Sequence, residues 1–93
     1  MKFEWDSQKS ARNERKHRVT FAEAISVFEE TLSVTYPGVD HSDEEDRFLI
    51  VGLTSSGSVL VVSHRFRDET IRVISARRAT TKGRLFYEKQ SSH

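Results

Sequence analysis

The sequence predicts an α+β fold with a short N-terminal strand, two helices, a twisted antiparallel sheet and a short C-terminal helix. Three observations predict it. Thr20 and Glu23 have the spacing of a helix-capping box, and apolar residues follow at helical intervals. The apolar runs 48–51 and 59–62 have the length and composition of buried strands. The turn-rich segment 54–58 separates these runs closely enough to favour an antiparallel connection.

The N-terminal part should contain one strand and two helices. Residues 3–5 alternate in polarity and predict a short strand. Asp6 is a suitable N-cap for a helix over 7–17, which carries few apolar residues. The second helix should begin after Thr20 and run to about Glu30. Its expected apolar face consists of Phe21, Ala24, Ile25, Phe28 and Leu32.

The C-terminal part should contain the sheet and one more helix. An extended piece at 32–36 precedes an acidic loop at 39–46. Thr80 or Thr81 can cap a final helix that includes the apolar residues 85–87. Three consecutive strands are expected at 47–53, 59–66 and 70–76.

The register of the last two strands depends on the turn between them. If 68–69 form a two-residue loop, Ser75 and Arg77 share a face with His64, and Leu60 lies opposite Arg77. A three-residue loop would reverse that parity.

Charge is segregated along the 93 residues, which we expect to form one domain. Residues 1–20 carry a net +3, residues 21–46 a net −8, and residues 47–93 a net +6. Ten of the fifteen basic residues are Arg, whose planar guanidinium binds phosphate through two hydrogen bonds. This pattern favours an anionic ligand, above all RNA. The alternative is an ordinary mixed, solvated surface.

Several classes of protein and site are disfavoured. There is no Cys, so disulfides, Cys-bound metals and a thiol nucleophile are excluded. The His residues lack metal-ligand spacing, and no nucleotide-binding glycine motif is present. No apolar run approaches the roughly 18 residues of a membrane span. We therefore expect no metal, no cofactor, no membrane association and a cytoplasmic location.

Two clusters combine a basic residue with a group that can move protons. Asn13, Lys16 and His17 lie at helical spacing on one face, where Lys and His could hold a phosphate and transfer a proton. A solvated Lys beside a helix-terminal His is the alternative. Glu45 and Arg47 are two apart where the acidic loop, which contains His41, enters a strand. They could orient a substrate or form only a surface salt bridge.

A third cluster is a strand that ends in two adjacent arginines, Arg77 and Arg78. The segment from Arg65 to Arg84, which includes Arg72, carries seven basic residues and two acids. Converging arginines could bind a phosphodiester and stabilise a five-coordinate transition state. Alternatively, their stems cover apolar surface.

Five motifs in order resemble the BrnT family, from about residue 2 to residue 88. They are Phe3-Glu4-Trp5-Asp6, Asn13-x-x-Lys16-His17, Val19-x-Phe21-x-x-Ala24, His41-Ser42-x-x-Glu45-x-Arg47 and Ile74-Ser75-Ala76-Arg77-Arg78-Ala79. Each motif is weak alone, but their joint order and spacing are specific.

The resemblance implies a RelE-like fold and a metal-independent endoribonuclease toxin of a type II toxin–antitoxin module. It also implies a BrnA-like ribbon-helix-helix antitoxin as partner, with DNA contacted only through that antitoxin. The catalytic set implied is Lys16, His17, Glu45, Arg47 and Arg77. RNA would be held by Arg65, Arg72, Arg78 and Tyr87.

One departure from the family pattern is Arg18, which stands where the family usually has Gly. A Gly there suits a left-handed helix end, so Arg18 must adopt a costlier conformation or the turn must differ. The departure motivates a second hypothesis, in which the chain is a weak or degenerate toxin that only binds RNA or antitoxin.

Overall fold

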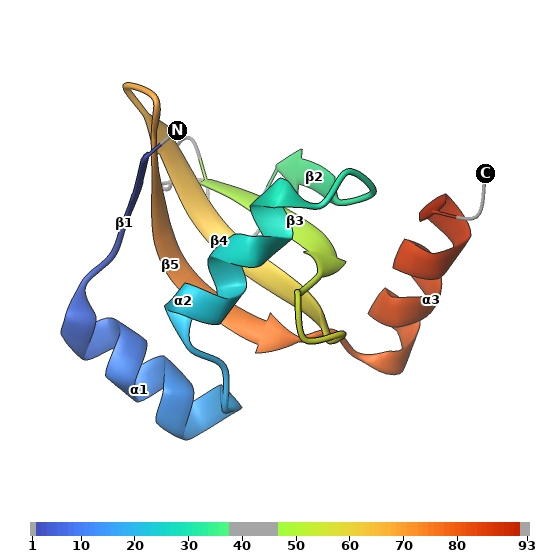
Figure 1. Ribbon diagram of the computed structural model, residues 1–93, viewed down its shortest axis with the longest axis horizontal. Coiled ribbons are helices and arrows are strands. Elements are labelled where there is room, and N and C mark those ends of the chain that lie inside the picture. Colours follow the sequence, from blue (N-terminus) through green and yellow to red (C-terminus); the bar gives the residue numbers. More distant parts are fainter. Residues whose placement is uncertain (1, 38–46, 92–93) are drawn as a thin grey trace.

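The computed structural model describes residues 2–37 and 47–91 and shows a five-stranded sheet with helices against it (Figure 1). The strand order is β1-β5-β4-β3-β2, with β1 parallel to β5 and the other neighbours antiparallel. The α+β prediction is confirmed, and β1 makes the sheet mixed. The strands are β1 (Lys2–Glu4), β2 (Val34–Pro37), β3 (Arg47–Leu53), β4 (Val59–Arg67) and β5 (Thr70–Arg78). The helical elements are α1 (Ser7–His17), α2 (Phe21–Ala24), the 3₁₀ helix η1 (Ile25–Glu29) and α3 (Thr81–Ser91).

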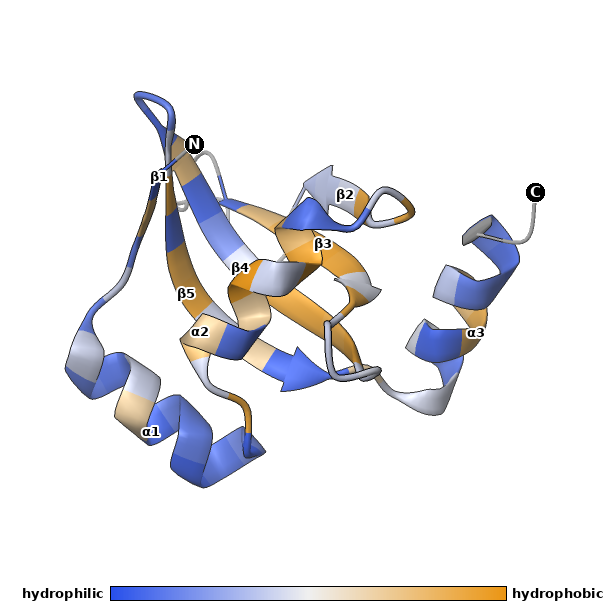
Figure 2. Ribbon diagram, viewed as in Figure 1, coloured by the Kyte–Doolittle hydropathy of each residue, from blue (hydrophilic) through white to orange (hydrophobic). Residues whose placement is uncertain are grey.

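The helical face of the sheet, which carries Ile50, Leu60, Val62 and Val73, packs against α2 and η1 and holds the main core. Figure 2 shows the contrast between the hydrophobic segments of β3 and η1 and the largely hydrophilic α1. Close packing here requires Gly52, because a Cβ at that position would lie 2.8 Å from Cγ1 of Val27. The other face carries a smaller cluster formed by Val51, Val61 and Tyr87 of α3.

The predicted N-caps are present at all three helices, with Thr80 capping α3 through the N–H of Gly83. The Asp6 carboxylate accepts hydrogen bonds from the N–H groups of Gln8 and Lys9, at 2.8 and 3.1 Å. The Thr20 hydroxyl accepts from the N–H of Glu23 at 3.0 Å. These bonds satisfy backbone donors that lack partners within the first turn of a helix, and they fix where α1 and α2 begin.

The second helix differs from the prediction in its geometry. It is α-helical only over Phe21–Ala24 and continues as the 3₁₀ helix η1. A 3₁₀ helix has three residues per turn, so Val27 follows Ala24 on the buried side, and both are fully buried. Leu32 was expected to complete the apolar face, but it lies beyond η1 and is 51% exposed.

The turn between β4 and β5 has the predicted length. Asp68 and Glu69 form a two-residue loop with φ of 50° and 67°, the signs of a type I′ turn. The predicted register beyond His64 is wrong, however. A bulge between Ser63 and His64 makes Arg77 the partner of Val61 rather than of Leu60.

Because the bulge adds one residue to β5, the residues beyond it change face. Val73 and Ala76, three apart, both point into the helical core. Arg77 therefore lies on the face opposite to His64, not on the same face as predicted. Arg78 takes the place opposite Leu60 instead.

Candidate functional site

Three arginines from three neighbouring strands lie in one row across the sheet. Arg47 pairs with Arg65, and Arg65 pairs with Arg72. Cross-strand partners project from the same face of a sheet, so the three side chains share one face. The row ends at β1, where Oε1 of Glu4 lies 3.2 Å from Nη1 of Arg72. We call this side of the sheet the arginine face.

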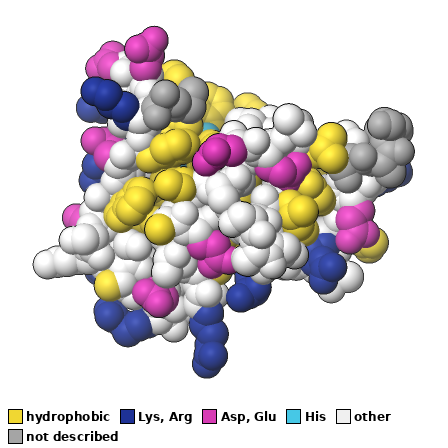
Figure 3. All heavy atoms as spheres, viewed as in Figure 1, with side chains coloured by type: hydrophobic (Ala, Val, Ile, Leu, Met, Phe, Trp, Pro, Cys, Tyr) yellow, Lys and Arg dark blue, Asp and Glu magenta, His cyan; other side chains and the backbone are white. Residues whose placement is uncertain are grey.

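Arg77 belongs to the same face. Its partner Val61 is four residues before Arg65 on β4, an even separation that keeps both on one side, about 13 Å apart along the strand. Arg77 is exposed. Figure 3 views the opposite, helical side, where the visible Lys and Arg side chains lie around the rim rather than in a row. Arginines from β3, β4 and β5 are thus concentrated on one face of the sheet.

Two residues predicted to contact RNA lie elsewhere. Arg78 projects from the helical face at the end of β5, and its Nη1 donates to the Ser58 hydroxyl at 3.0 Å. Tyr87 is 6% exposed and packs against Val51 and Val61. Neither side chain belongs to the arginine row. The bulge places Arg78 on the helical face, and the Tyr87 ring is buried against the sheet.

The hydroxyl of Tyr87 is engaged by Glu30, where η1 ends. It donates to Oε1 of Glu30, which also accepts from the N–H of Leu53, while Oε2 accepts from the N–H of Leu32. Partial burial raises the pKa of Glu30, but these three hydrogen bonds outweigh it and lower the pKa below its ordinary value. Burial and the Glu30 carboxylate raise the pKa of Tyr87 to about 12. The hydrogen bond between Tyr87 and Glu30 connects α3 to the end of η1.

The C-terminal turn of α1 carries Lys16 and His17. Lys16 is exposed and His17 is half-buried. Arg18 follows in the left-handed conformation, with φ 59° and ψ 35°, and its N–H donates to the carbonyl of Glu14 at 2.8 Å. Arg18 therefore adopts the left-handed conformation that suits Gly, at some cost in backbone energy. The helix α1 thus ends with the same geometry that a Gly at this position would give.

Asn13 was grouped with Lys16 and His17 by helical spacing, but the structure gives it a different role. Asn13 is the one buried residue of α1. Its Nδ2 donates to the carbonyls of Val19 and Ala76, at 2.9 and 2.8 Å, and its Oδ1 accepts from the N–H of Ala76 at 3.1 Å. Asn13 thus joins the end of α1 to the end of β5, directly before Arg77. The only sequence signal for this role of Asn13 is its place in the middle of a helix that has few apolar residues.

The remaining predicted residues, Glu45 with His41 upstream, lie outside the described residues. Within residues 2–37 and 47–91, no group of three or more His, Cys, Asp or Glu side chains is placed to hold a metal ion. In the same ranges, no helix is long and apolar enough to cross a membrane.

Comparisons with known proteins agree with the fold. A family model described as "Ribonuclease toxin, BrnT, of type II toxin-antitoxin system" matches residues 5–83. The crystal structure of the Brucella abortus ribonuclease toxin BrnT is similar to this chain with a TM-score of 0.70 and 29% identity. That likeness covers 87% of this chain and 99% of the other. No curated protein matches the chain.

Proposed function

The chain belongs to the BrnT family of ribonuclease toxins of type II toxin–antitoxin systems, and we propose that it cleaves RNA on the arginine face without a metal ion. The observation that carries this proposal is the placement of Arg47, Arg65, Arg72 and Arg77 on one side of the sheet. Arginines bind phosphate through paired, charge-assisted hydrogen bonds, so the face can hold an RNA backbone along several phosphates.

The proposed reaction is an internal transfer at one phosphodiester. The 2′-hydroxyl oxygen attacks the adjacent phosphorus, the bond to the 5′-oxygen breaks, and the products are a cyclic phosphate and a free 5′-hydroxyl. One proton leaves the 2′-hydroxyl and one joins the departing oxygen. His17, or less favourably Glu45, would move these protons.

Cationic side chains would stabilise the charge that develops on the phosphate. Lys16, Arg47 and Arg77 are proposed for this role, because preorganised cations can stabilise a five-coordinate transition state without a metal. Arg65 and Arg72 would hold the neighbouring RNA backbone. Arg78 and Tyr87 are left out, since one faces the other side and the other is buried.

The proposed protein partner is a BrnA-like ribbon-helix-helix antitoxin that covers the arginine face and contacts DNA through its own domain. The family implies an antitoxin in general terms. A basic face of this kind also favours an acidic binding segment, because complementary charges guide association.

The second hypothesis, a degenerate and non-catalytic toxin, rests on the presence of Arg18 where the family usually has Gly. Arg18 adopts the left-handed conformation that the family Gly would adopt. The turn after Lys16 and His17 is therefore kept, which favours an active enzyme over a degenerate one.

The test is cleavage of a defined RNA by purified protein in excess EDTA, with the ends of the products identified. We expect cyclic phosphate and 5′-hydroxyl ends, unchanged by chelation, and a large loss of rate in Arg47→Ala. The control is Arg12→Ala, which removes an exposed arginine of α1. Cleavage abolished by EDTA and restored by one metal would refute metal independence. No cleavage by the unaltered protein would favour the non-catalytic hypothesis.

A further inference from the structure

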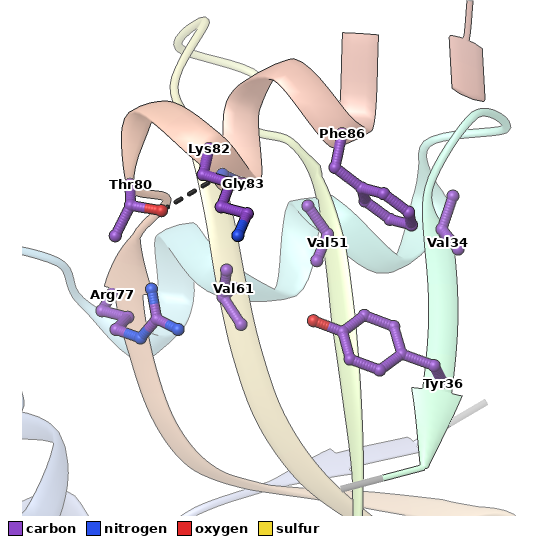
Figure 4. Close-up of a pocket in the computed structure, with 9 residues that line it drawn as sticks. All are labelled: Val34, Tyr36, Val51, Val61, Arg77, Thr80, Lys82, Gly83 and Phe86. Carbon is purple, nitrogen blue, oxygen red and sulfur yellow. Dashed lines mark hydrogen bonds between the residues drawn. The ribbon is translucent and has the colours of Figure 1, made fainter. Parts of the chain in front are cut away.

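A cavity of about 460 Å³ lies between the arginine face and α3. Its floor is apolar, formed by Val34, Val51 and Val61 from three adjacent strands, which are paired across the sheet. Two aromatic rings stand over one side, Tyr36 from β2 and Phe86 from α3 (Figure 4). These rings are 37% and 43% exposed, so they are accessible to a ligand.

The other side of the cavity is cationic. Arg77 and Lys82 line it across from the aromatic rings, and both are exposed (Figure 4). Thr80 begins this wall, and its hydroxyl accepts from the N–H of Gly83 at 3.1 Å, which fixes the first turn of α3. The cavity therefore offers an apolar floor, an aromatic side and a positively charged side within one space.

This combination restricts the chemistry of the ligand. A purely apolar ligand would leave the two cations without a counter-charge, and a free anion would make no use of the rings. A nucleotide has both parts: a flat base that stacks on aromatic side chains and a phosphate that binds Arg or Lys. The charge also agrees, because Arg77 belongs both to this cavity and to the arginine face, where the phosphates of an RNA are proposed to lie.

We propose that this cavity binds one unpaired nucleobase of the RNA, next to the phosphate held by Arg77. The inference rests on the proposed function for the identity of the polymer. It makes Tyr36 and Phe86 specificity-determining residues, which favour single-stranded RNA because a paired base must first break its pairing and stacking to enter. Losing one stacking ring should weaken base binding about 10-fold.

The test is a titration of single nucleotides, observed by NMR of the valine methyl groups. Adenosine, guanosine, cytidine and uridine monophosphates are each added to the full chain, with ribose phosphate as the base-free comparison. At least one nucleotide should shift the methyl signals of Val51 and Val61, which floor the cavity. The methyl signals of Val27 and Val62, fully buried in the helical core, should stay unchanged.

Two variants separate stacking from simple apolar contact. Phe86→Leu keeps an apolar side chain but removes the ring, and Tyr36→Leu does the same on β2. Each should raise the dissociation constant of the preferred nucleotide about 10-fold. Leu85→Ala is the matched control, since Leu85 neighbours Phe86, is 60% exposed and does not line the cavity. Equal shifts with ribose phosphate, or no shifts with any nucleotide, would overturn the inference.

Cleavage assays distinguish this failure from failure of the proposed function. If the protein binds nucleotides in the cavity but cleaves no RNA, the base site stands and the catalytic proposal fails. The opposite result is cleavage of RNA by a protein whose cavity methyl signals shift with no nucleotide and shift only with an acidic partner peptide. In that case the cavity is a protein-docking site and the base site is refuted.

Discussion

The side-chain amide of Asn13 binds both backbone polar groups of Ala76, at 2.8 Å for the carbonyl and 3.1 Å for the N–H. A neighbouring strand would normally make these two bonds. β1 pairs with β5 from Thr70 to Arg72, and further along the chain Asn13 supplies the partner. Because Ala76 directly precedes Arg77, this contact fixes the strand end from which that arginine projects.

Asn13→Ala should destabilise the fold by about 2–4 kcal/mol, because it leaves the polar groups of Ala76 and the Val19 carbonyl without their partner. Asn13→Asp should not rescue stability, since a carboxylate cannot donate to two carbonyls. Urea denaturation measures both changes, with Arg12→Ala as the exposed control on the same helix. A loss below about 0.5 kcal/mol in Asn13→Ala would show that water replaces the amide.

Stability should fall in mild acid because of His64. This residue is 4% exposed, and its ring packs edge-on against Phe28 with centroids 4.8 Å apart. Burial lowers the pKa of His64 below its ordinary value of 6.5. As pH drops below about 6.5, the unfolded chain binds a proton that the folded chain does not, so stability decreases until the folded pKa is reached.

The measurement compares the free energy of unfolding with pH for the unaltered protein and for His64→Gln. The carboxylates titrate in both proteins, so the difference between the two slopes isolates His64. The variant should show the shallower slope as pH falls below about 6.5. Identical slopes would mean that His64 titrates alike in the folded and unfolded chains.

Tyr87→Phe should lower the free energy of unfolding by about 1.5 kcal/mol, because it removes a hydrogen bond to the Glu30 carboxylate while keeping the ring. The raised pKa of Tyr87, about 12, adds a pH signature. Its stabilising contribution is complete below about pH 10 and declines as pH rises toward 12. Circular dichroism across this range should therefore show an alkaline decline that Tyr87→Phe lacks. Leu85→Ala should behave like the unaltered protein.

Antitoxin binding should weaken as salt rises. The proposed contact surface carries Arg47, Arg65, Arg72 and Arg77, and added salt screens the attraction between such surface charges and an acidic partner, with a screening length of about 8 Å at physiological ionic strength. Calorimetric titration at low and high salt measures the effect. An affinity that stays constant would show that apolar burial dominates this contact.

Local patterns were enough to predict most elements of the fold. The strands β3 and β4, the two-residue turn at Asp68 and Glu69, and the caps at Asp6 and Thr20 each depend on neighbours in sequence. Residue polarity, turn chemistry and capping distance act over a few residues, and a single sequence displays them directly.

What escaped prediction depends on packing between distant segments. The bulge beside Ser63 cannot be predicted from the sequence of β5 alone. The order of polar and apolar residues in β5 is compatible with pairing to β4 either with or without one extra residue. The roles of Asn13 and Tyr87 arise from contacts across 63 and 57 residues. The arginine row had a sequence signal in its composition, but the grouping of Arg47 with Arg65 and Arg72 required the strand register.

The central claim is that Arg77 serves cleavage rather than folding, and three variants measured side by side test it. RNA cleavage rate and thermal midpoint are recorded for Arg77→Ala, Arg77→Lys and the control Arg12→Ala. Arg77→Ala should lose about 10²-fold in rate, as does loss of one transition-state donor, with stability changed by less than about 0.5 kcal/mol. Arg77→Lys should recover only part of the rate, because an ammonium cannot form a bidentate fork. Normal cleavage by Arg77→Ala, or its unfolding, would contradict the account.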